Sequence, residues 1–113
     1  MKIIRDSIPL DELSRMAGEL FGNMVKAVVD VDKELLAVDA ELHSDLEALL
    51  LQEGSIQKFL WGINLYPEMQ GSDFIEFDSM INVRPSQGNA SRGVTDKELQ
   101  ERIAGIVSKR IVR

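Results

Sequence analysis

The sequence predicts an α+β domain of two layers, in which a mainly antiparallel four-stranded sheet carries three helices on one face. Two segments, 25–42 and 57–85, alternate apolar and polar residues as hairpins with one buried face do. Three others, 7–23, 44–54 and 94–113, place their apolar residues at helical spacing. The order of elements is therefore α-β-β-α-β-β-α. We expect the whole chain, residues 1–113, to be a single globular domain.

The first helix is predicted within 7–23. Pro9 suits a first-turn position, and Asp11 and Glu12 follow where the helix dipole favours negative charge. Gly22 and Asn23 then supply a stop. The preceding "KIIR" is long enough for a brief strand only.

The segment 25–42 is predicted to form a β-hairpin. Its first arm is rich in valine, its second arm alternates leucine, valine and alanine with other residues, and the polar "DKE" at 32–34 makes the turn. A continuous helix is the competing prediction, because Lys, Glu, Leu and Ala are good helix formers. The valine-rich first arm opposes it.

The second helix is predicted to begin at Ser44, which with Glu47 forms a capping box, and to terminate at Gly54. A second hairpin follows, with arms at 57–68 and 73–85. Pro85 ends it because proline has no amide hydrogen for a sheet ladder.

The last helix is predicted within 94–113. Thr95 and Glu98 form a second capping box, and Lys109, Arg110 and Arg113 suit the negative end of the helix dipole.

Composition excludes several classes of protein. The apolar fraction of 44% with 28% charged residues is that of a globular protein, and the chain has no cysteine for disulfides, thiolate zinc sites or Cys nucleophiles. No apolar run is long enough for a transmembrane helix, and the amino terminus does not resemble a signal peptide, so we expect a cytoplasmic protein that is not bound to a membrane. No cofactor is predicted.

The net charge of −6 argues against nucleic-acid binding, which requires a surplus of Lys and Arg. The charge is unevenly distributed, however. Residues 84–113 carry seven basic and three acidic side chains and sum to +4, so the preceding 83 residues sum to −10. This asymmetry favours an anion site or complementary self-association, with a solvated helix face as the ordinary alternative.

The stretch "VRPSQGNASRG", residues 83–93, concentrates hydrogen-bond donors between a predicted strand and a helix. Arg84 and Arg92 could each contact a phosphate or carboxylate, and Gln87, Asn89 and Ser91 supply neutral hydrogen bonds. The alternative is an ordinary turn in which Arg84 pairs with a nearby carboxylate. Two glycines have the spacing of a Walker A loop, but the phosphate-binding lysine is absent, so that class of nucleotidase is excluded.

His43 is the single imidazole of the chain, and any general base at neutral pH would be sought there first. Glu41, His43 and Asp45 could present a metal set at two-residue spacing. Because the helix start already accounts for Asp45, and a lone histidine cannot form a multi-histidine site, no metal site is predicted. Asp78 lies among the polar residues of the predicted exposed sheet face.

Three stretches, "ELHSDLEALLLQEGS", "LWGINLYPE" and "EFDSMINVRPSQGNASRGV", carry a resemblance across nearly the whole chain. The chain resembles a family of small bacterial and archaeal proteins classed as a domain of unknown function, marked by the FDSMIN-RPSQGN-SRGV block. The resemblance implies a compact prokaryotic cytosolic protein. It implies no activity, cofactor or site.

The leading functional prediction is binding of an anionic, phosphate- or nucleotide-like small ligand at the loop 84–93. The alternative is a structural or interaction module that forms a homodimer or binds a protein partner. A weaker alternative is a hydrolase-type enzyme that uses His43 with Asp78 or Glu41. The predicted ligand-binding residues are Arg84, Gln87, Asn89, Ser91, Arg92, His43 and Asp78.

Overall fold

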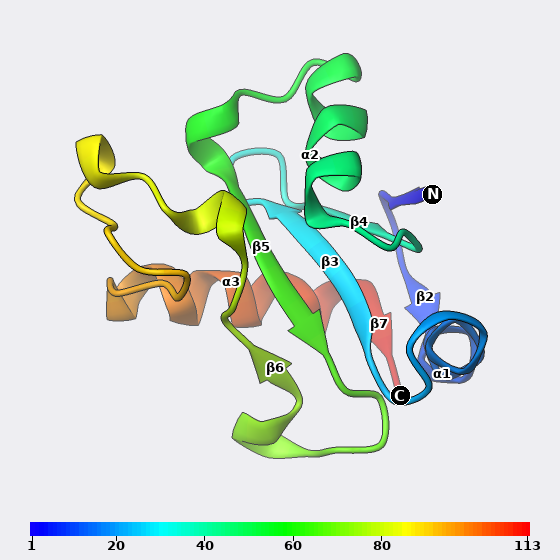
Figure 1. Ribbon diagram of the computed structural model, residues 1–113. Helices are drawn as coiled ribbons and strands as arrows, with labels where there is room; N and C mark the ends of the chain where they lie inside the picture. Colours follow the sequence, from blue (N-terminus) through cyan, green and yellow to red (C-terminus); the bar gives the residue numbers. More distant parts are fainter.

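A computed structural model describes residues 1–113 and has a five-stranded sheet at its centre (Figure 1). All neighbouring strands of this sheet are antiparallel, in the order β1-β4-β3-β5-β6. The strands are β1 (Lys2–Ile4), β3 (Val25–Asp30), β4 (Leu35–Val38), β5 (Leu60–Leu65) and β6 (Ile75–Glu76). A small parallel pair joins β2 (Ile8–Pro9) to β7 (Ile111–Val112), near the two ends of the chain.

Three helices complete the structure: α1 (Leu10–Leu20), α2 (His43–Gln52) and α3 (Lys97–Arg110). The α+β class, the three helices and the mainly antiparallel sheet are therefore confirmed. The sheet has five strands instead of the predicted four, and short strands precede α1 and follow α3, so the predicted element order is incomplete.

The helices cover both faces of the sheet, and the prediction that all three lie on one face is wrong. Leu13 of α1 and Ile103 of α3 pack with Val29 in the larger hydrophobic cluster. Leu46 of α2 packs with Val28 in a separate cluster. Adjacent strand residues point to opposite faces, so these clusters lie on opposite sides of the sheet. In Figure 1, α3 passes behind the strands, and α2 lies on the near side above them.

The reason is that the central strands are apolar on both faces. Every residue of β4 is buried, as is every residue of β3 except the half-buried Lys26. A strand that is buried on both sides has an almost continuous apolar sequence, and such a sequence requires a covering layer on each side.

The hairpin predicted for 25–42 is confirmed as β3 and β4, which pair from Ala27 with Val38 to Asp30 with Leu35. Buried Asp30 holds its turn. One carboxylate oxygen accepts the amides of Asp32 and Lys33, each at 2.9 Å, and the other accepts the Ser55 hydroxyl at 2.6 Å.

Two predicted helix caps are wrong by one or two residues. The residue before α2 is Leu42, which provides no side-chain acceptor, so Ser44 lies inside the helix. At α3 the cap is Asp96, whose carboxylate accepts the amide of Glu98 at 2.9 Å, because Thr95 is engaged elsewhere. Gly54 does terminate α2 in the left-handed region, at φ 101°.

The second arm of the second predicted hairpin is strand only at Ile75–Glu76. Beyond it, a short 3₁₀ helix at Met80–Asn82 replaces the ladder. The Asn82 side chain takes the place of a strand, since its amide donates to the Gly62 carbonyl at 2.9 Å and its oxygen accepts the Gly62 N–H at 2.8 Å.

None of the three helices combines the length and the apolar composition that crossing a bilayer would require.

Candidate functional site

The loop 84–93 folds back on itself as a tight turn. Arg84 and Asn89 form an isolated antiparallel bridge, with the Arg84 amide donating to the Asn89 carbonyl at 2.7 Å. Gly88 has φ 79°, in the left-handed region that glycine adopts without strain. The predicted turn is therefore present.

Asn89 is buried, with 4% of its surface exposed, and holds the loop together. Its amide donates to the carbonyls of Asn82 at 2.7 Å, Gly93 at 2.8 Å and Ser91 at 3.2 Å. Its oxygen accepts both the amide and the hydroxyl of Thr95, at 3.0 and 3.1 Å. The side chain of Asn89 is thus fully occupied inside the protein.

Arg84 is anchored to the start of β5 and does not face a hollow. Its guanidinium donates to the carbonyl of Gln57 at 2.7 Å and to that of Leu60, and it lies 4.1 Å above the ring centroid of Trp61. Burial lowers the pKa of this guanidinium from its usual value. No carboxylate pairs with Arg84, contrary to the ordinary-turn alternative.

The other two predicted neutral ligands, Gln87 and Ser91, also bond to backbone groups of the protein. The Gln87 amide donates to the Lys58 carbonyl at 3.3 Å, and the Ser91 hydroxyl oxygen accepts the Gly93 amide at 3.2 Å. Arg92 differs from them, because its Nε donates to Asp78 at 2.6 Å while its two terminal nitrogens make no hydrogen bond in the protein.

Arg92 and His43 line the same shallow hollow, of about 160 Å³, at the start of α2. Two of the seven predicted site residues are therefore brought together here, with Asp78 beside them through its bond to Arg92. Arg84, Gln87, Asn89 and Ser91 do not line it. The full lining is Lys26, Leu42, His43, Ser44, Ser79, Met80, Ile81 and Arg92.

His43 is the first residue of α2 and is 8% exposed. Its Nε2 lies 2.8 Å from the Ile63 carbonyl oxygen, which can only accept, so Nε2 carries the ring hydrogen. Burial lowers the pKa of His43, with smaller lowering effects from Lys26 and Arg92, against the opposing effects of the Ile63 hydrogen bond and Asp78. The ring is therefore neutral at pH 7.

Lys26 is the residue of the hollow that the sequence reasoning missed. It lies on β3 directly across from Asn64 of β5, and its ammonium is 5.3 Å from the ring centroid of Phe21. The signal was present in the sequence, because Lys26 is the one cation within an otherwise valine- and alanine-rich strand.

A polar network adjoins the hollow on β5 and β6. The Asn64 amide donates to Glu76 at 2.9 Å and to the Asp78 carbonyl at 3.2 Å, and the Tyr66 hydroxyl donates to the same Glu76 oxygen at 2.9 Å. Burial, followed by the bond to Glu76, raises the pKa of Tyr66. These polar side chains of the predicted sheet face therefore bind one another.

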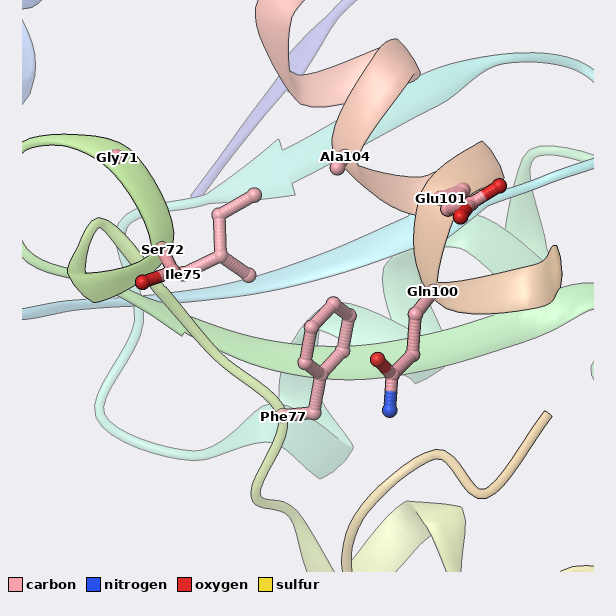
Figure 2. A pocket seen from close by; sticks show the side chains of 7 residues that line it. All are labelled: Gly71, Ser72, Ile75, Phe77, Gln100, Glu101 and Ala104. Atoms are coloured by element: carbon pink, nitrogen blue, oxygen red, sulfur yellow. The ribbon is translucent and has the colours of Figure 1, made fainter. Parts of the chain in front are cut away.

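A second, larger hollow of about 250 Å³ lies between β6 and α3 and is mainly apolar. Figure 2 shows Ile75 and Phe77 extending toward α3, from which Gln100 reaches down beside Phe77. Gln100 is engaged by the Val94 carbonyl, and the charged residue on the rim is Glu101. This hollow has no cation for an anionic ligand.

The basic carboxyl-terminal segment meets the acidic body within the chain. Lys109 pairs with Glu34 at 3.0 Å, and Arg110 donates to the carbonyls of Glu34 at 2.8 Å and Asp6 at 2.9 Å. The charge asymmetry of the sequence is thus used intramolecularly. No group of three or more His, Asp or Glu side chains is arranged to hold a metal ion.

No curated protein and no solved structure matches the chain. One family model does match, over residues 2–110, which is nearly the whole length. The chain therefore belongs to the family described as "Protein of unknown function (DUF5674)".

Proposed function

We propose that this protein binds a small anion in the hollow at the start of α2. The observation that carries the proposal is that two cations from separate elements, Lys26 of β3 and Arg92 of the loop, line one hollow with the first residues of α2. The amino-terminal end of a helix carries partial positive charge, and no side chain caps the first turn of α2, although Asp45 in that turn offsets part of the charge. The three sources of positive potential support one another.

The charge balance favours an incoming anion, even though the chain as a whole carries −6. Lys26 forms no ion pair, and Asp78 is the one carboxylate paired with Arg92. That pair is 56% and 43% exposed, so solvent screens it and it is weak. The two free terminal nitrogens of Arg92 match the bidentate geometry of a carboxylate or phosphate.

The rest of the loop, in this proposal, positions Arg92 and does not touch the ligand. The Arg92 carbonyl accepts the Ser79 amide and the Asn82 side chain, each at 2.9 Å. Arg84, Gln87, Asn89 and Ser91 hold the adjacent turn through the bonds described above. The hydrogen-bond donors concentrated in this stretch then fix the backbone of the loop, so that the Arg92 guanidinium lies at the edge of the hollow.

The volume of the hollow limits the ligand. Sites for drug-sized molecules measure about 300–1,000 Å³, whereas this hollow measures about 160 Å³. It suits a free oxyanion, or the anionic end of a larger molecule whose body remains outside.

A titration of the ¹⁵N-labelled protein with sodium phosphate at constant ionic strength tests the proposal. We expect saturable shifts of the amide resonances of His43, Ser44 and Arg92. The double variant Lys26→Gln, Arg92→Gln removes both cations, and it should weaken binding roughly a hundredfold if each cation contributes a typical charged hydrogen bond.

A matched control removes the same charge elsewhere. Lys58 and Lys97 are exposed and form no ion pair, and their double glutamine variant should bind phosphate like the wild type. If phosphate, sulfate and acetate all fail to give a saturable shift in the wild type, anion binding at this hollow is refuted. If the control variant binds phosphate as weakly as the Lys26, Arg92 variant, the weaker binding results from the change in net charge and not from the hollow.

A protein-binding role is the second candidate, and exposed apolar side chains around the same hollow favour it. Leu42 is 54% exposed and Met80 is 65% exposed, and both lie on the rim. Self-association through this rim predicts a dimer mass in light scattering that Met80→Gln reduces to the monomer mass. A wild-type monomer at high protein concentration would exclude that version.

A further inference from the structure

His43 lines the hollow, and the ring nitrogen that makes no hydrogen bond in the protein is an acceptor, not a donor. Nε2 carries the hydrogen because it is bonded to the Ile63 carbonyl, so the second nitrogen, Nδ1, holds a lone pair. The residue is 8% exposed and lines the hollow. Nδ1 has no hydrogen-bond partner in the protein and is not fully shielded from solvent.

The surroundings keep this ring neutral. Burial is the main cause of the lowered pKa of His43, and Lys26 and Arg92 lower it further. The hydrogen bond to Ile63 and the charge of Asp78 oppose this shift without reversing it. A bound anion could be accommodated by protonating Nδ1, or by a hydroxyl group of the ligand that donates a hydrogen bond to Nδ1. The hydroxyl donor leaves the ring neutral and keeps the bond from Nε2 to the Ile63 carbonyl.

We propose that the hollow selects an oxyanion that still carries a hydroxyl hydrogen, such as hydrogen phosphate or a singly ionised phosphate monoester, over a fully ionised one such as sulfate. The proposal rests on anion binding at this site and deepens it. Phosphate oxygens accept from Lys26, Arg92 and the first amides of α2, while the P–OH group donates to Nδ1 of His43. Sulfate has no hydrogen to donate, so one of its oxygens would face the lone pair of Nδ1 and be repelled.

This arrangement gives selectivity because a site built to accept a hydroxyl disfavours an analogue that lacks it. The hollow is open to solvent, so the discrimination should be smaller than in an enclosed site. One hydrogen bond of ordinary strength corresponds to roughly a tenfold ratio of dissociation constants.

The test compares sodium phosphate with sodium sulfate on the full chain, by amide chemical-shift titration at constant ionic strength and pH about 6. At this pH inorganic phosphate keeps a hydroxyl hydrogen, as does about half of a phosphate monoester. Phosphate should bind at least about tenfold more tightly than sulfate. In His43→Gln, the side-chain amide keeps a donor for the Ile63 carbonyl but removes the acceptor at Nδ1, so the phosphate-to-sulfate ratio should fall toward one. Lys97→Gln should keep the wild-type ratio.

A direct signature does not depend on any variant folding. His43 is the one histidine, so its ring ¹⁵N resonances need no assignment by mutation. Phosphate should move the Nδ1 resonance in the direction of a nitrogen that accepts a hydrogen bond, and sulfate should not. A fully protonated ring in the phosphate complex would overturn the proposal.

The remaining outcomes distinguish a failure of anion binding from a failure of selection by His43. If neither ion binds, and acetate does not bind either, anion binding itself fails. If both bind equally, or the ratio is unchanged in His43→Gln, the site binds anions but His43 does not select among them, and this inference fails. Phenyl phosphate provides one more arm. Tighter binding than inorganic phosphate, through Leu42 and Met80 on the rim, would assign a phosphate monoester, and weaker binding would assign the free ion.

Discussion

The alanine variant of Gly62 tests how closely Ser79 and the 3₁₀ helix at Met80–Asn82, which bind the Arg92 carbonyl, pack on β5. A Cβ atom built on Gly62 would lie 2.5 Å from Cβ and 2.6 Å from Oγ of Ser79, and 3.1 Å from Cγ1 of Ile81. Atoms do not approach so closely, and Cβ of Ser79 cannot move without its backbone. The 3₁₀ helix at Met80–Asn82 must therefore shift away from the sheet.

The cost follows from two contributions. Overpacking in a buried place costs about 1–3 kcal/mol. The shift also lengthens the two hydrogen bonds between Gly62 and the Asn82 side chain, 2.8 and 2.9 Å long, which contribute about 1 kcal/mol each. Together these give a loss of about 3–5 kcal/mol in the free energy of unfolding. With a urea m-value of about 2 kcal/mol/M, the midpoint should fall by roughly 2 M.

Urea denaturation followed by circular dichroism and by Trp61 fluorescence measures this loss. Gly105 is the internal control, because it lies in α3 and a Cβ built there has no atom within 4 Å apart from the neighbouring backbone of its own helix. Gly105→Ala should stabilise the protein by up to about 1 kcal/mol through helix propensity. Ser79→Gly, combined with Gly62→Ala, should recover part of the loss. A Gly62→Ala midpoint within experimental error of the wild type would refute the close approach of Ser79.

Three further predictions concern single side chains. Lowering the pH below about 6.5, the usual histidine pKa, should reduce the free energy of unfolding. The lowered pKa makes folded His43 bind fewer protons than the unfolded chain does, so protons favour unfolding. Urea titrations at several pH values should show this dependence in the wild type and a weaker one in His43→Gln. Asn89→Ala should cost about 3 kcal/mol in thermal or urea unfolding, since it removes three donated and two accepted bonds at a buried site, and a loss below about 1 kcal/mol would contradict its central place in the loop. Arg84→Lys should cost about 2 kcal/mol and change Trp61 fluorescence, because an ammonium cannot reproduce the planar fork or the stacking; an unchanged spectrum would count against the contact.

The parts of the fold that follow local patterns could be predicted from the sequence. The helix that begins after Pro9 and the hairpin through Asp30 depend on spacing, turn residues and the difference between helical and strand periods, all of which neighbouring residues determine. The caps were displaced by one or two residues because several polar residues compete for one position, and tertiary contacts such as that of Thr95 with Asn89 decide among them.

The placement of α2 on the opposite face of the sheet could not be predicted on the assumption that each strand buries one face only. Val28, Leu35 and Leu60 lie on the face of the sheet opposite the larger cluster, and they form the second cluster with α2. The near-continuous apolar sequence of β3 and β4 indicates burial on both faces. The alternation at 73–85, which predicts one buried face, lies mostly outside a strand.

The donors of the loop could be counted from the sequence, but their partners could not be identified. Arg84 binds carbonyls 27 and 24 residues away, and main-chain acceptors leave no trace in residue type. Lys26 stands out in its strand as a cation, but its place in the hollow depends on the pairing of β3 with β5 next to the start of α2, which is a tertiary contact.

The way the outer edge of β5 is covered has a consequence for behaviour at high concentration. Beyond the short pairing with β6, Asn82 bonds to both backbone groups of Gly62, and Arg84 bonds to the Leu60 carbonyl. An unpaired strand edge is a template for a strand from another molecule and hence for aggregation. The side chains of Asn82 and Arg84 occupy these backbone groups of β5 without adding a strand. The segment that positions Arg92 therefore also protects the centre of the sheet from pairing with a strand of another molecule.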